Sequence, residues 1–67
     1  MELIEREWST EQQKHVNTWL ANDKSEIHSG FDPDSAVGSM IIVVRAGCTY
    51  IKNADGKWQK FGSTEVI

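Results

Sequence analysis

The chain has 67 residues, a formal net charge of −3 and 39% hydrophobic residues, which predict one small folded domain over residues 1–67 rather than a disordered chain. Cys48 is the only cysteine, so an internal disulfide is excluded, and no Cys/His cluster offers a structural zinc site. The longest apolar run, residues 40–44, is far shorter than the roughly 20 residues of a membrane-spanning helix. The acidic start of the chain does not resemble a signal peptide, so we expect a cytoplasmic protein.

Charge is unevenly divided between the two halves of the chain. Residues 1–34 contain eight acids and three bases, a net charge of −5, whereas residues 35–67 contain two acids and four bases, a net charge of +2. Scattered surface charge usually serves solubility alone. An acidic first half would also suit contact with a basic surface on another protein, because complementary charges speed association.

The first predicted elements are a short strand and a helix. Ile4 and Trp8 would share one side of either element, and a strand over residues 2–8 is favoured because a helix can then begin cleanly after it. The run Ser9–Gln12 matches a capping box, in which the Ser hydroxyl and the Gln side chain satisfy free backbone N–H groups. A helix is therefore predicted from Thr10 to Ala21, with enough apolar surface to cover one face of a small sheet. Its apolar stripe consists of Val16, Trp19 and Leu20.

The long connection over residues 23–38 shows no sustained hydrophobic period. Such connections are uncommon in compact domains and usually carry a function or hide a short element. Asp32 and Pro33 suit the first positions of a helix, so a single helical turn is predicted from Pro33 to Val37. Three apolar side chains are expected to pin the connection to the core, namely Ile27, Phe31 and Val37.

A three-stranded antiparallel meander is predicted from Ser39 to Phe61. Its strands are expected at residues 40–44, 48–52 and 57–61, and the pairs Ala46-Gly47 and Asp55-Gly56 supply the turns. Residues 64–67 are expected to form either a frayed tail or a short fourth strand.

The register of the second hairpin stays open between two alternatives. A two-residue turn pairs Tyr50 with Phe61, whereas a three-residue loop pairs Tyr50 with Lys60 and Lys52 with Trp58. Because side chains alternate along a strand, the choice decides which of Trp58 and Phe61 lies on which face.

Both faces of the predicted meander are apolar in either register, but the chain offers only one helix to cover them. Exposing four large apolar side chains forgoes roughly 1.5–3 kcal/mol each, which rivals the total stability of about 5–15 kcal/mol expected for a small domain. The second face is therefore covered by residues 23–38, or it is left for a partner protein or a second copy of the chain.

No group of residues predicts catalysis, a metal site or a cofactor, and no small-molecule substrate is evident. Cys48 is interpreted as an inert thiol, because the sequence places no base beside it. His15 is interpreted as a packing residue, and His28 with its neighbouring acids matches no spacing of metal ligands. The glycines are scattered and form no phosphate-binding loop.

The sequence thus predicts an α+β fold, with one N-terminal helix packed on a three- to four-stranded antiparallel sheet. The expected function is non-enzymatic: the protein binds another protein, or itself, and modulates that target. Aromatic side chains dominate interface energetics, so Tyr50, Trp58 and Phe61 are the expected anchors. Asp32 and Asp34 are the expected secondary contacts.

A single-stranded nucleic-acid binder is the alternative prediction. Exposed aromatic rings of a hairpin can stack on bases while basic side chains hold phosphates. The aromatic residues would be the same three, and the basic residues would be Arg45, Lys52, Lys57 and Lys60.

The small size, the absence of an active-site motif and the three tryptophans resemble the small accessory and inhibitor proteins of phages and mobile elements. The resemblance lies in general character. It implies action by direct contact with a target and gives no residue a role.

Overall fold

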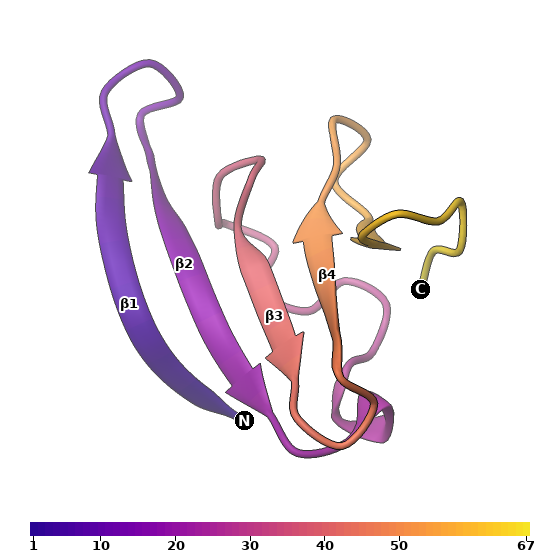
Figure 1. The fold of residues 1–67 in the computed structure, drawn as a ribbon. Coiled ribbons are helices and arrows are strands. Elements are labelled where there is room, and N and C mark those ends of the chain that lie inside the picture. Colours follow the sequence, from indigo (N-terminus) through magenta and orange to yellow (C-terminus); the bar gives the residue numbers. More distant parts are fainter.

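The computed structural model describes residues 1–67 and consists of one five-stranded sheet without an α-helix (Figure 1). The spatial order of the strands follows their order in the chain. β2 and β3 run parallel, and every other neighbouring pair is antiparallel. The elements are β1 (Glu2–Ser9), β2 (Lys14–Ala21), a short 3-10 turn η1 (Lys24–Glu26), β3 (Met40–Val43), β4 (Cys48–Lys52) and β5 (Trp58–Lys60).

The predicted α+β fold, with an N-terminal helix on the sheet, is wrong. The segment predicted as a helix from Thr10 to Ala21 contains a tight turn followed by β2. The capping signal at Ser9 is nevertheless used: its hydroxyl accepts a hydrogen bond from the backbone N–H of Gln12 at 3.2 Å. Gln13 then takes a positive φ of 56° and donates its N–H to the Ser9 carbonyl oxygen at 2.8 Å, so the chain reverses instead of continuing as a helix.

β2 forms a strand because its side chains suit the period of a strand and because it gains a hydrogen-bonded neighbour on each side. Val16, Thr18 and Trp19 are β-branched or aromatic, types that are enriched in strands. Asn17 and Ala21 are buried, and both lie at even spacing on the same face as Trp19. Buried and partly exposed side chains therefore alternate along β2 with the two-residue period of a strand, although its apolar residues also fit the spacing of a helix.

The predicted strand over residues 2–8 is confirmed as β1, which pairs with β2 from Glu2 to Ser9. Ile4 has no partner, because the register shifts between Leu3 and Glu5. The hairpin of β1 and β2 is longer than the other strands and forms one margin of the sheet (Figure 1).

The parallel pairing of β2 and β3 explains the long connection over residues 22–39. Parallel neighbours need a crossover of a dozen or more residues, which is usually a helix. Here the crossover consists of turns, and the predicted helical turn from Pro33 to Val37 is absent. Asp32 has a φ of 51°, and its carbonyl oxygen accepts hydrogen bonds from both the N–H and the hydroxyl of Ser35, at 3.2 and 2.8 Å. These bonds close a tight turn where a capped helix was expected.

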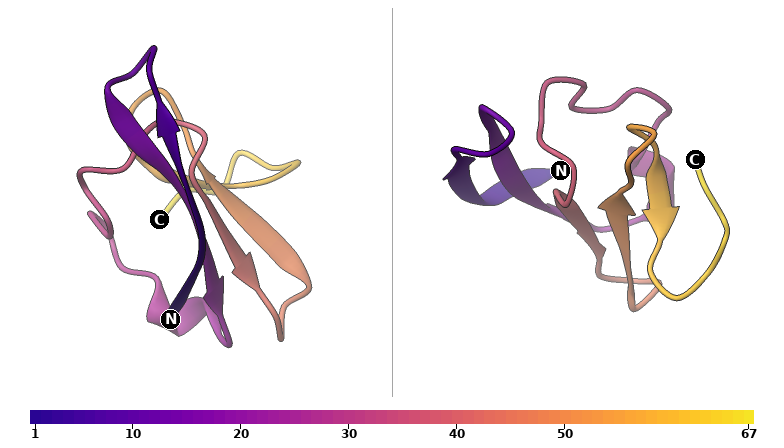
Figure 2. Two further views of the ribbon diagram at one scale, coloured as in Figure 1. Left: turned by 90° about the vertical axis from the view of Figure 1, so that its left-hand side faces the viewer. Right: turned by 90° about the horizontal axis from the view of Figure 1, so that it is seen from above.

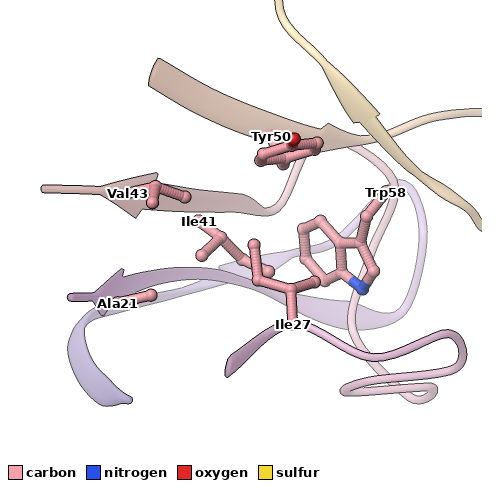
Figure 3. Packing of buried hydrophobic residues seen from close by; sticks show 6 residues of the cluster. All are labelled: Ala21, Ile27, Ile41, Val43, Tyr50 and Trp58. Carbon is pink, nitrogen blue, oxygen red and sulfur yellow. The ribbon is translucent and has the colours of Figure 1, made fainter. Parts of the chain in front are cut away.

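The crossover lies on the concave side of the curled sheet and forms the second layer of the core (Figure 2). Ile27 is buried, and Phe31 packs against the buried cluster with its ring centroid 5.1 Å from that of Trp19. The predicted pinning by Ile27 and Phe31 is confirmed, whereas the pinning by Val37 is wrong because that side chain is 43% exposed. Figure 3 shows the buried cluster itself, which comprises Ala21, Ile27, Ile41, Val43, Tyr50 and Trp58.

The meander of β3, β4 and β5 is confirmed, and its second hairpin adopts one of the two predicted registers. Tyr50 pairs with Lys60 and Lys52 pairs with Trp58, which is the pairing of the three-residue loop. Trp58 therefore joins the core face, and Phe61 follows on the opposite face.

The last residues form neither a frayed tail nor a further strand, but they contact β5. Gln59 and Val66 form an antiparallel bridge. The backbone N–H of Ile67 donates to the Trp58 carbonyl oxygen at 2.9 Å, and the Ile67 side chain packs against the core.

Candidate binding face

One side of the sheet is covered by the crossover, and the opposite side has no second layer (Figure 2). Cross-strand partners share a face of a sheet, so the strand pairings identify the side chains on this uncovered side. We call it the outer face; from β2 to β5 it comprises Val16, Thr18, Leu20, Met40, Ile42, Thr49, Ile51 and Gln59.

The side chains of the outer face form continuous rows across the strands. One row runs from Thr18 through Met40 and Ile51 to Gln59, and the next joins Leu20, Ile42 and Thr49. All eight residues are partly exposed, whereas their neighbours on the concave side include side chains with no exposure at all. The result is an apolar strip that reaches solvent, formed by Val16, Leu20, Met40, Ile42 and Ile51 and bordered by the polar side chains of Thr18, Thr49 and Gln59.

Phe61 lies at the β5 end of the strip and is the most exposed large hydrophobic residue, at 72%. Its backbone N–H donates to the Thr49 carbonyl oxygen at 2.8 Å, which continues the antiparallel alternation and places Phe61 on the outer face. A hollow of about 210 Å³ lies at the same margin. It is lined by Ile51, Asn53, Gln59, Lys60, Phe61 and Gly62.

Tyr50 and Trp58, two of the three predicted anchors, lie in the core, each 1% exposed. The indole N–H of Trp58 donates to the carbonyl oxygen of Phe31 at 2.9 Å, and the hydroxyl of Tyr50 donates to the Glu65 carboxylate at 2.8 Å. Burial raises the pKa of the Tyr50 phenol, with the Glu65 carboxylate adding to the shift. Of the predicted anchors, only Phe61 presents its ring to solvent.

Asp32 and Asp34, the predicted secondary contacts, lie on the crossover, away from the outer face. The Asp32 carboxylate accepts hydrogen bonds from Asn17 Nδ2 at 3.0 Å and from the Trp19 indole N–H at 2.8 Å. Asp32 therefore fixes the crossover to β2, while Asp34 is exposed.

The four basic residues of the alternative prediction do not form one surface. Lys52 is buried with 5% exposure, and Arg45 lies in the turn between β3 and β4, with its Nε 3.6 Å from the Asp23 carboxylate. Lys60 is the last residue of β5 and lines the hollow beside Phe61, whereas Lys57 lies in the loop before β5. The structure thus brings one aromatic ring and one lysine together at that margin.

The remaining candidates for reactive chemistry are isolated. Cys48 is a partly buried free thiol packed against the core. His15 packs edge-on against Trp8, with ring centroids 4.9 Å apart, and His28 packs against Phe31 at 5.7 Å. Nowhere do three His, Cys, Asp or Glu side chains gather as a set of metal ligands. None of the helical segments has the length and hydropathy to cross a membrane.

Sequence reasoning missed the part of the outer face that lies on β2. The helical spacing predicts that Val16 and Leu20 lie on a helix and face the sheet. In the structure they belong to the sheet itself and face outward. The alternation of Asn17, Trp19 and Ala21 with these residues was the available signal.

Comparison with known proteins adds no relative: no family model, no curated protein and no solved structure matches the chain.

Proposed function

We propose that this protein is a non-enzymatic binding module that contacts another protein through the outer face of its sheet. The observation that carries the proposal is the uncovered apolar strip centred on Met40, Ile42 and Ile51. Complete burial of one such side chain is worth about 1.5–3 kcal/mol, so covering the exposed part of several side chains gives an interface a substantial driving force.

An accessory or inhibitor role fits this mode of action. A chain of 67 residues without a gathered reactive site can act by occupying a surface of its target. Interfaces also tend to be organised around exposed aromatic anchors, and Phe61 supplies one beside the hollow.

Single-stranded nucleic-acid binding has less support than protein binding. Stacking platforms need exposed rings, and burial removes Tyr50 and Trp58 from that role. Affinity for phosphates grows with the number of basic contacts, and the buried Lys52 is committed to the crossover.

The proposal is tested by site-specific photo-crosslinking in extract of the cells that encode the protein. A benzophenone amino acid at Thr49, on the outer face, is expected to give a protein adduct identified by mass spectrometry. The matched control carries the same group at Asp55, in the exposed β4–β5 turn, and is expected to give none. Equal adducts from both positions, or none from Thr49, would contradict the proposal, and an adduct between two copies would identify a homodimer.

A further inference from the structure

The margin of the outer face along β1 is acidic. Glu2, Glu5 and Glu7 are exposed and lie opposite outer-face residues of β2, so their carboxylates border the apolar strip on the same side of the sheet. The pairs are Glu2 with Leu20, Glu5 with Thr18, and Glu7 with Val16.

The register shift in β1 is what aligns these acids. Glu2 and Glu5 are three residues apart, a spacing that would place them on opposite faces of a regular strand. The irregularity between Leu3 and Glu5 restores Glu5 and Glu7 to the face of Glu2. β1 thus gathers three carboxylates on one side, while Leu3, Arg6 and Trp8 pair with the concave side of β2.

The three carboxylates are not neutralised within the chain. The ion pairs of the molecule involve Glu26, Glu65 and Asp23. Lys14, opposite Ser9 at the tip of the hairpin, is the one basic residue that the strand pairings place on this face. One lysine against three glutamates gives the β1 margin of this face a net charge of −2, while Lys60 lines the hollow at the opposite margin.

A second copy of the chain suits the β1 margin less well than a basic partner does. It would bring its own three glutamates into the interface and offer only Lys14 and Lys60 from the strip and the hollow in return, and like charges across an interface weaken association. A basic partner instead gains attraction along β1 as well as apolar contact along β2 to β4.

The opposite margin of the strip offers room for one side chain. The hollow beside Phe61 has about 210 Å³, below the roughly 300–1,000 Å³ typical of small-molecule sites. Its lining combines the apolar side chains of Ile51 and Phe61 with Asn53, Gln59, Lys60 and Gly62. The side formed by Ile51 and Phe61 suits contact with one large apolar side chain of a partner.

We infer that the partner presents a protein segment with apolar side chains in its centre and Lys or Arg along one side. The basic side lies over Glu2, Glu5 and Glu7, the apolar centre covers Met40 and Ile42, and a large apolar side chain enters the hollow beside Phe61. This inference rests on the proposed function and adds the chemistry and orientation of the partner.

The test is a selection of random short peptides displayed on phage against the full chain, followed by affinity measurements on the enriched sequences. We expect enriched peptides that combine large apolar residues with Lys or Arg. Neutralising the margin in the triple variant Glu2→Gln, Glu5→Gln, Glu7→Gln should weaken their binding about fivefold, as expected when three exposed charge pairs of a few tenths of a kcal/mol each are lost. Raising the salt from about 0.05 to about 0.5 M should weaken binding to the native chain and have less effect on the triple variant.

The matched control neutralises three exposed acids away from the outer face and changes the net charge equally. It combines Glu11→Gln, Asp34→Asn and Asp55→Asn, which lie in turns, and should leave peptide affinity within about twofold, as expected for substitutions outside the contact. Equal weakening by the two triple variants would overturn the inference, because only overall charge would then matter.

Two further outcomes separate the inference from the proposed function. The enriched peptides could lack Lys and Arg and still bind the Met40→Gln variant more weakly than the native chain. This result would overturn the inference that the partner is basic and would support the outer face as a binding surface. Peptides unaffected by Met40→Gln, or a selection without enrichment, would overturn both. Thermal unfolding of each variant confirms that the sheet is retained.

Discussion

Lys52 shows how one side chain can hold the two layers of this small domain together. It extends from β4 to the crossover, where its ammonium group has three N–H donors within 3.2 Å of four acceptors: the carbonyl oxygens of Asp32, Pro33 and Ser35 and the Ser35 hydroxyl. Burial lowers the pKa of Lys52, while the nearby Asp32 carboxylate opposes that shift. The hydrogen bonds offset the cost of placing a charge in the interior.

Replacing Lys52 by Met should therefore destabilise the fold although it adds an apolar side chain. The carbonyl groups left without a donor should lower the free energy of unfolding by about 2–3 kcal/mol. Lys57→Met, at an exposed position of the next turn, should change it by less than about 0.5 kcal/mol. Urea unfolding measures both, and a similar small effect of the two variants would show that Lys52 does not secure the crossover.

The crossover is the element that makes one face of the sheet a core and leaves the other open. It has no strand and no helix beyond the single 3-10 turn η1, and it is held to the sheet by side chains of Ile27 and Phe31 and by hydrogen bonds from the sheet. The Phe31 ring lies between those of Trp19 and Trp58, with centroid distances of 5.1 and 6.2 Å. An irregular segment can serve as the second layer because these contacts fix it at several points.

The two phenylalanines provide a matched test of this arrangement. Phe31→Ala should lower the free energy of unfolding by about 2–3 kcal/mol, somewhat below the usual cost for a fully buried ring, because Phe31 is partly buried. Phe61→Ala should change stability by less than about 0.5 kcal/mol, because its side chain is mostly exposed on the outer face. Equal losses in chemical denaturation would contradict the assignment of the two faces.

At the scale of the whole molecule, two glutamates tie the ends of the chain to its body. The Glu26 carboxylate accepts a hydrogen bond from the Met1 amino group at 2.6 Å and others from the backbone N–H groups of Asn22 and Asp23. These contacts lower the pKa of Glu26 to about 2. Glu65 accepts hydrogen bonds from Lys24 and Tyr50, and the Lys24 ammonium group is the main cause of its lowered pKa.

Because the pKa values of Glu26 and Glu65 are lowered in the folded state, part of the free energy of unfolding depends on pH and is lost in acid. Because the carboxyls bind protons more weakly when folded than when unfolded, their contribution is present above pH 4.5 and is lost as the pH falls toward about 2. Urea unfolding at a series of pH values should show this fall, and Glu26→Gln should make it shallower. Glu11→Gln, in the exposed hairpin turn, should keep the native slope; an unchanged slope in Glu26→Gln would refute the role of Glu26.

Elements with local signals could be predicted from the amino-acid sequence. The apolar run after Ser39 and the Asp55-Gly56 turn predicted the meander. The apolar character of both its faces left two outcomes open, namely cover by residues 23–38 or a face left for a partner or a second copy. Phe61 also followed from the sequence as a candidate contact, and the structure places it on the exposed side.

Contacts between segments distant in sequence determine which residues share the outer face and which are buried. β2 is a strand because β3, distant in sequence, pairs with its second edge. No pattern within residues 10–21 indicates that β3 will be its neighbour. The hairpin register buried Trp58, and the irregularity in β1 aligned the glutamates with the apolar strip. Each of these outcomes depends on a pairing between separate segments, and a shift of one residue in any pairing would move the side chains to the other face.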